Sequence, residues 1–303
     1  MEMRQLLRQV ARGDRRALAK AITAVEDDPE TASKLFGVLR PPGHVFVLGV
    51  TGPPGTGKST LVDRLVAAYR GRKLKVAVIA VDPSSPITGG ALLGDRIRMT
   101  DHAADGGVYI RSMASRGWSG GLSRTTSQVI QLMDSAGYDV VIIETVGIGQ
   151  SDMEVVGVSH GVLVVLMPGM GDDIQMSKAG LMEIGDVYVV NKGDLEGADA
   201  MVVGLLSLVR TLKSRSPSVI KVSALSGDGM DKLDSAVEGI RTRFRRGDPA
   251  VRLRSIKGMM VEMAKGNLVD GFLRRADRRA DELAKEVAAG RLTIAEAAER
   301  LTA

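Results

Sequence analysis

The sequence predicts an α/β fold with a mainly parallel central sheet flanked by helices, plus helical extensions at both ends. Three observations predict it. Between residues 43 and 247, short apolar runs typical of buried strands alternate with helical patterns. A glycine-rich loop at 52–59 separates the first run from a helix. Residues 1–42 and 248–303 lack strand-like runs and show helical spacing.

The first 42 residues are predicted to form a helical N-terminal arm. Charged and apolar positions alternate there with helical spacing, and the pattern ends at Pro41-Pro42-Gly43. The apolar stripe expected to be buried comprises Leu6, Leu7, Val10, Ala17, Ala21 and Val25.

Residues 52–59, the phosphate loop, fit the motif G-x-x-x-x-G-K-[ST], with the apolar run 45–50 before it and a helix after it. Its glycines let backbone N–H groups turn towards phosphates, Lys58 reaches the β- and γ-phosphates, and the Ser59 hydroxyl reaches Mg²⁺. This arrangement is typical of P-loop NTPases. The predicted nucleotide-binding residues here are Gly52, Pro53, Pro54, Gly55, Thr56, Gly57, Lys58, Ser59 and Thr60.

Two later apolar runs lead into acidic residues. Residues 75–81 precede Asp82, and residues 140–143 precede Glu144, which stands where a D-x-x-G motif usually has Asp. A Glu carboxylate still offers an oxygen ligand to Mg²⁺. Because parallel strands bring their carboxyl ends to one sheet edge, we expect both acids to face the phosphates.

Residues 191–194 read Asn-Lys-Gly-Asp after a strand-like run, and this fits the guanine motif N-K-x-D. Asp194 would accept from the N1–H and the exocyclic amine of guanine, which adenine does not present together. Asn191 would brace loops, and the Lys192 stem would lie along the base. GTP is therefore expected rather than ATP. An S-A-x loop, whose backbone contacts the guanine carbonyl, is formed by Ser223, Ala224 and Leu225.

Longer stretches extend these motifs into a more specific pattern. They are the phosphate loop and residues 81–99, 110–117, 144–151, 168–175 and 189–192. Together they resemble the MeaB/ArgK/MMAA GTPases, which chaperone adenosylcobalamin-dependent acyl-CoA mutases such as methylmalonyl-CoA mutase. The resemblance covers most of residues 40–240.

The resemblance implies roles for individual residues. The hydrolytic residues would be Lys58, Asp82, Asp95, Arg98 and Glu144, and the groups around Mg²⁺ would be Ser59, Asp82, Asp95 and Glu144. An additional switch that relays the nucleotide state to the mutase would include Asp172, Asp173, Gln175 and Lys178. The chain departs from the family pattern at 118–123 and 176–180, so its partner contacts there are expected to differ.

Composition narrows the classes of function. The chain has 303 residues, 44% of them hydrophobic, and no cysteine, which excludes disulfides and Cys-ligated zinc. His102 does not belong to a D-x-H-x-x-G cobalamin-ligand pattern, so the partner rather than this chain is expected to bind adenosylcobalamin. No run approaches 18 uncharged apolar residues, and we expect a cytoplasmic location without a membrane partner.

Residues 248–303 are expected to form helices broken near Gly266, Gly271 and Gly290. Lys and Arg exceed Asp and Glu in this part of the chain. An acidic partner or nucleic acid could contact Arg274-Arg275 and Arg278-Arg279, but a solvated helix face explains the charges better, so no nucleic acid is expected. The resemblance suggests a homodimer that buries the apolar stripe Leu283, Val287, Leu292, Ile294, Ala297 and Leu301.

Two alternatives to a mutase chaperone stay open. An ATPase or kinase linked to lysine, arginine and ornithine transport is one, although Asn191 and Asp194 favour guanine. A metal-insertion GTPase is the other, and it predicts a Cys- or His-rich segment that the sequence lacks.

Overall fold

The computed structural model describes residues 3–28, 43–82, 102, 104–114, 125–145, 151–169, 183–212 and 217–302. The chain divides into two compact units, Met1–Met259 and Met260–Ala303. The boundaries proposed from the sequence, at residues 42 and 247, stay predictions.

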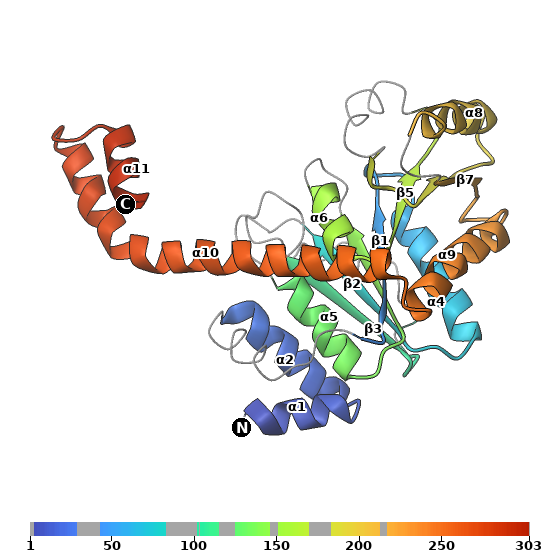
Figure 1. The fold of residues 1–303 in the computed structure, drawn as a ribbon, viewed down its shortest axis with the longest axis horizontal. Coiled ribbons are helices and arrows are strands. Elements are labelled where there is room, and N and C mark those ends of the chain that lie inside the picture. The colour runs from blue at the N-terminus through green and yellow to red at the C-terminus, as the bar shows by residue number, and fades with distance from the viewer. Residues whose placement is uncertain are drawn as a thin grey trace. The chain divides into compact units, whose positions relative to one another are not determined.

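The first unit is built on a seven-stranded parallel sheet with the strand order β3-β2-β4-β1-β5-β6-β7 (Figure 1). β1 lies at the centre, where the strand order reverses, between β4 and β5. In chain order the strands are β1 Phe46–Thr51, β2 Val76–Asp82, β3 Val108–Ala114, β4 Val140–Thr145, β5 Gly161–Leu166, β6 Val187–Val190 and β7 Ser218–Lys221. The α/β prediction is thus confirmed, and ligand loops belong at the carboxyl ends of these strands.

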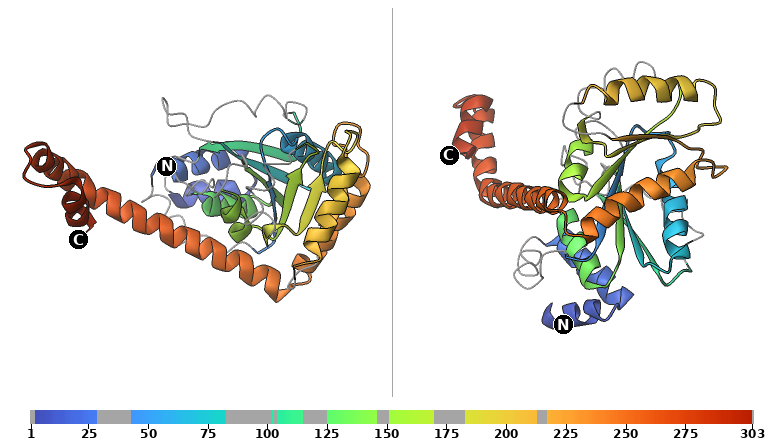
Figure 2. Two further views of the ribbon diagram at one scale, coloured as in Figure 1. Left: turned by 90° about the horizontal axis from the view of Figure 1, so that it is seen from above. Right: turned by 45° about the vertical axis from the view of Figure 1, so that its right-hand side comes forward.

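Helices cover both faces of the sheet (Figure 2). α4 Lys58–Gly71 and α9 Met230–Arg245 pack with Phe46, Leu48 and Val50 on one face. α5 Thr126–Ser135, α6 Ser151–Val158 and α8 Ala198–Val209 pack on the other, with Val47. Because successive strand residues point to opposite faces and both faces are buried, a central strand reads as an unbroken apolar run.

β3 is the strand that the apolar runs did not indicate. It lies at one edge of the sheet and contains Arg111 and Ser112 in its middle, both half-buried. Arg111 donates hydrogen bonds to Glu26 and to the Thr23 hydroxyl, so it ties this edge to the N-terminal helices. A polar edge strand of this kind produces neither a continuous apolar run nor strict alternation.

The N-terminal arm consists of α1 Met3–Ala11 and α2 Arg15–Asp27. All six residues of its predicted stripe are buried, in one core with α5. Gly13, at φ 80°, makes the turn between the helices, and Asp14 caps α2 by accepting from the backbone N–H groups of Arg16 and Ala17 at 2.8 and 3.0 Å.

The C-terminal helices are α10 Pro249–Ala288 and α11 Ile294–Thr302. The predicted breaks near Gly266 and Gly271 are wrong, because α10 continues through both and ends before Gly290, at φ 71°. Glycine within a helix costs only about 1 kcal/mol relative to alanine, which helix-forming neighbours offset. Within the described ranges, no helix combines the length and apolar composition needed to cross a lipid bilayer.

Candidate GTP site

The phosphate loop joins the end of β1 to the start of α4. Gly52, Gly55 and Gly57 all have positive φ angles, 136°, 79° and 87°. A Cβ on Gly52 would lie 2.0 Å from the Val165 carbonyl oxygen, so no larger residue fits there. These glycines let the chain turn tightly into α4, whose N-terminal N–H groups form a positively polarised site for phosphate.

Lys58 is the buried first residue of α4. Its ammonium donates to the carbonyl oxygens of Gly52 and Pro53, at 2.7 and 3.0 Å. The loop carbonyls therefore hold this charge inside the loop, where phosphate oxygens would be bound. Thr56 is buried and donates to the Pro53 carbonyl at 2.9 Å, whereas Pro54, Gly55 and Thr60 are exposed.

Ser59 and Glu144 meet beside the phosphate loop. The Ser59 hydroxyl donates to Glu144 Oε1 at 2.7 Å, and both residues are buried. A hydroxyl and a carboxylate oxygen this close are hard donors of the kind that Mg²⁺ prefers, so the residues present fit this ion. Asp82 ends β2, beside the carboxyl end of β4, although its side chain lies outside the described part.

Asn191 connects the phosphate loop to the S-A-x loop at residues 223–225, the guanine loop. Its buried amide nitrogen donates to the Thr56 carbonyl at 2.7 Å, and its oxygen accepts from the Ala224 N–H at 3.0 Å. A Cβ on Gly57 would lie 2.5 Å from that nitrogen, so glycine is required for the approach. Two segments distant in sequence are thereby fixed relative to each other.

Asp194 is exposed beside the guanine loop. The pKa of its carboxyl lies below the usual range because the Ser223 hydroxyl donates to it, helped by a backbone N–H and by the charge of Lys192. The group is therefore an anion, as acceptance from two guanine donors requires. Lys192 has φ 54°, an unusual backbone conformation for a side-chain-bearing residue. A hollow of about 420 Å³ borders Asp194 and Ser223.

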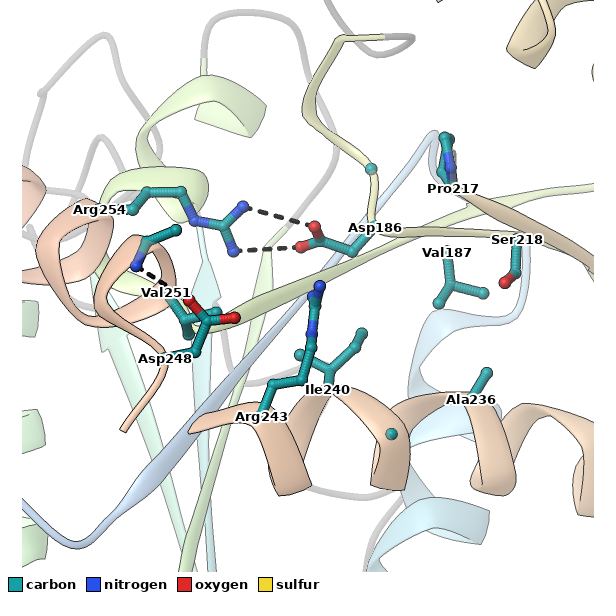
Figure 3. Close-up of a pocket in the computed structure, with 13 residues that line it drawn as sticks. Asp186, Val187, Pro217, Ser218, Ala236, Ile240, Arg243, Asp248, Val251 and Arg254 are labelled. Carbon is teal, nitrogen blue, oxygen red and sulfur yellow. Dashed lines mark hydrogen bonds and ion pairs between the residues drawn. The ribbon is translucent and has the colours of Figure 1, made fainter. Parts of the chain in front are cut away.

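A larger hollow, of about 670 Å³, lies at the amino ends of β6 and β7 (Figure 3). Asp186 and Arg254 meet in it, with Arg254 Nη2 3.1 Å from Asp186 Oδ2. The same nitrogen donates to the His160 carbonyl at 2.8 Å. In a parallel sheet this edge is opposite the phosphate loop, so the hollow is not part of the nucleotide site and Arg254 instead fastens the start of α10.

Several predicted site residues lie outside the described ranges. They are Asp95, Arg98, Asp172, Asp173, Gln175 and Lys178. The structure therefore brings together the phosphate loop, Glu144, residues 191–194 and the guanine loop, and it leaves the switch residues as predictions.

Comparison with known proteins identifies the family of the chain that carries this site. A family model described as "Methylmalonyl Co-A mutase-associated GTPase MeaB" matches residues 18–276. The chain belongs to the MeaB family. A putative GTPase of Pyrococcus abyssi is 43% identical over 277 residues, covering 89% of this chain and 84% of the relative. The GTPase ArgK of Escherichia coli is 39% identical over 248 residues, covering 78% of this chain and 75% of ArgK.

A solved structure supports the same fold. The crystal structure of a LAO/AO transport system kinase superposes with a TM-score of 0.72 and 26% identity, covering all of this chain and 98% of the other. The MeaB-family relatives are named as GTPases, and the P-loop geometry agrees with them. This MeaB-family chain is therefore a nucleotide-binding GTPase that hydrolyses GTP.

Proposed function

We propose that this GTPase is a chaperone of an adenosylcobalamin-dependent acyl-CoA mutase of the methylmalonyl-CoA mutase type. It would gate cofactor loading, or protect and reactivate the mutase, with GTP hydrolysis as the timing step. The family model carries this proposal, because the proteins that define it are mutase-associated GTPases and it matches 18–276. Adenosylcobalamin would be held by the partner. The absence of cysteine agrees with the reducing cytoplasm, which is the location we propose.

The nucleotide would lie across the carboxyl edge of the sheet. Its phosphates would accept from the phosphate-loop N–H groups and from Lys58, whose ammonium already lies within the loop. Its guanine would donate to Asp194 and accept from the guanine loop. Because Asn191 joins the two loops, phosphate and base contacts form on one connected framework. Such positioning provides most of the catalysis in phosphoryl transfer.

The metal proposed for this site is Mg²⁺, held by Ser59 and Glu144 with Asp82 and Asp95. When bound, the ion neutralises charge on the phosphate oxygens. Ser59 and Glu144 would keep their oxygens beside the phosphates, and Asp82 would contribute from the end of the neighbouring strand. Arg98 and Asp95 belong to the predicted switch segment, and we propose that this segment changes with the nucleotide state.

We also propose that the C-terminal region forms a homodimer. α10 exposes large apolar side chains on its surface, and α11 contains no buried residue. Exposing several large apolar side chains to water is energetically unfavourable unless a partner covers them. The exposed apolar residues of α10 are Leu253, Ile256, Met260, Val261, Leu268 and Val269.

A transport-linked kinase is the second candidate, favoured by the name of the solved relative. It requires ATP as phosphoryl donor, whereas Asp194 is an anion placed beside a guanine-type loop. A metal-insertion GTPase, which would deliver nickel or another metal, has less support. The described residues contain no cluster of three or more His, Cys, Asp or Glu that could hold a metal.

The test compares nucleotide binding with mutase-coupled hydrolysis. Calorimetry of the full chain should show GTP and GDP binding well above ATP, and Lys58→Ala should lower GTP turnover about 100-fold or more, because a charge beside the transferred phosphate is lost. Lys178→Ala should retain basal turnover but lose the stimulation by a purified mutase. Equal loss of basal and stimulated rates would contradict the chaperone relay, and equal binding of GTP and ATP would contradict the guanine assignment.

A further inference from the structure

The guanine loop is also held by a residue that belongs to none of the sequence motifs. Arg64 lies on α4, about two turns after Lys58. Its Nε donates to the Ala224 carbonyl at 2.9 Å, and its Nη2 donates to the Leu225 carbonyl at 2.7 Å. The guanidinium is a rigid fork of donors, so these two bonds fix the orientation of two successive peptide groups.

The turn around the loop is closed at its base, where the Gly227 N–H donates to the Ser223 carbonyl at 2.8 Å and the Ser223 N–H donates to the Asp228 carbonyl at 2.9 Å, but residues 224 and 225 at its tip have few further contacts. Ala224 is tied from the opposite side by Asn191, but the Leu225 side chain is 82% exposed and contributes no packing. The described residues offer no acceptor to the Leu225 backbone N–H. That donor is thus available to a ligand, and its direction is set by the peptide groups that Arg64 holds.

We propose that Arg64 is a specificity-positioning residue, which orients the Leu225 N–H towards the carbonyl group of guanine. It would connect α4, whose first residues Lys58 and Ser59 belong to the phosphate loop, to recognition of the group at position 6 of the base. This inference rests on the guanine placement proposed above. Arg64 does not touch the reacting atoms, so its effect should appear in affinity and base selectivity rather than in the chemical step.

A purely structural role predicts a different result. Arg64 and Leu225 are both exposed, so removing the guanidinium leaves the Leu225 carbonyl accessible to water, and only the part-buried bond to the carbonyl of Ala224 is lost without full replacement by water. Unfolding stability should therefore change little. Selectivity at position 6 of the base should change instead. A loop that samples more orientations places the Leu225 N–H less accurately, so it distinguishes poorly between an oxygen and a sulfur acceptor at that position.

The experiment measures displacement of a fluorescent ribose-labelled GDP from the full chain by three nucleotides. 6-Thio-GDP differs from GDP only at position 6, and IDP differs only by lacking the 2-amino group. In Arg64→Gln the GDP affinity should fall about 3- to 10-fold, as expected for one or two hydrogen bonds, and the preference for GDP over 6-thio-GDP should fall by a similar factor. The preference for GDP over IDP, which depends on Asp194, should be unchanged.

Arg72→Gln is the matched control. Arg72 follows α4 directly and pairs with Asp234 and Glu238 of α9, away from the guanine loop. It should leave all three affinities unchanged. Arg64→Lys keeps the charge but not the fork, and it should lie between wild type and Arg64→Gln. If Arg64→Gln fails to fold, the preference for GDP over 6-thio-GDP measured for Arg64→Lys tests the inference instead.

Equal weakening of GDP, 6-thio-GDP and IDP by either Arg64 variant would overturn the inference, since selectivity at position 6 would then be independent of Arg64. A wild-type chain that binds IDP as tightly as GDP would instead contradict the placement of Asp194 on guanine. The two failures are therefore distinguishable.

Discussion

His160 illustrates how burial determines the charge of a side chain. It is almost fully buried between Phe46 and Phe244, with ring centroids 6.0 and 3.9 Å away, and its Nδ1 accepts from the Val47 N–H at 2.9 Å. Burial, with smaller contributions from Arg254 and Arg252, lowers its pKa to about 3. The imidazole is thus neutral in the folded protein at physiological pH.

We predict that His160 makes the fold sensitive to acid. Its folded pKa lies below the unfolded value of about 6.5, so between about pH 6.5 and 3 the unfolded chain binds the extra proton and stability falls as the pH falls. The slope from this group approaches about 1.4 kcal/mol per pH unit. Urea unfolding of wild type and His160→Asn at pH 7, 6 and 5 should show a smaller loss in the variant. Asn can keep the Val47 bond, and identical slopes would count against the prediction.

Individual site residues could be predicted to different extents. The phosphate loop, Glu144 and Asp194 belong to short motifs whose spacing carries the chemistry, so the sequence alone indicated them. Arg64 could not be found this way. Its partners lie 160 and 161 positions later in the chain, and a single Arg on a helix has no distinguishing pattern.

At the scale of elements, α6 and α10 make an unusually close contact. Gly157 of α6 faces Gly258 of α10, and a Cβ on Gly258 would lie 2.0 Å from the Gly157 carbonyl oxygen. A side chain at Gly258 would not fit at this separation, whereas a Cβ on Gly157 would lie 3.3 Å from the Gly258 Cα. The sequence does not reveal this role, because glycine in a helical pattern more often suggests a break.

Gly258→Ala should therefore destabilise the first unit by about 1–3 kcal/mol, since the new methyl group overlaps backbone that cannot move aside. Gly239→Ala is the opposite case. Gly239 lies within α9 and nothing is within 4 Å of an added Cβ, so alanine should stabilise by about 0.5–1 kcal/mol through helix propensity. Chemical denaturation of the full chain measures both. A neutral Gly258→Ala would show that the contact is adjustable.

At the scale of the whole molecule, the proposed homodimer depends on the second unit. Leu268 is 73% exposed on α10, and an apolar side chain of this size gains from burial against a second chain. We predict that Leu268→Glu converts a dimer to a monomer, because a carboxylate in an apolar interface loses its water. Sedimentation velocity of the full chain measures the mass.

Asp281→Lys is the control for this change. Asp281 is also exposed on α10, but the helical period of 3.6 residues places it on the opposite side from Leu268. It should keep the wild-type mass. A wild-type chain that sediments as a monomer would remove the homodimer from the proposal.

The sequence by itself determined the α/β class, the strands that precede the phosphate loop, Asp82, Glu144 and Asn191, and the motifs at 52–59 and 191–194. These features are local: a strand buried on both faces must be apolar along its length, and a phosphate-binding turn must place glycines at fixed spacing. Only the tertiary structure decided what depends on contacts between distant segments. The polar edge strand β3, the unbroken α10, the joint made by Asn191 and the hold of Arg64 on the guanine loop each depend on partners that the chain brings together only by folding.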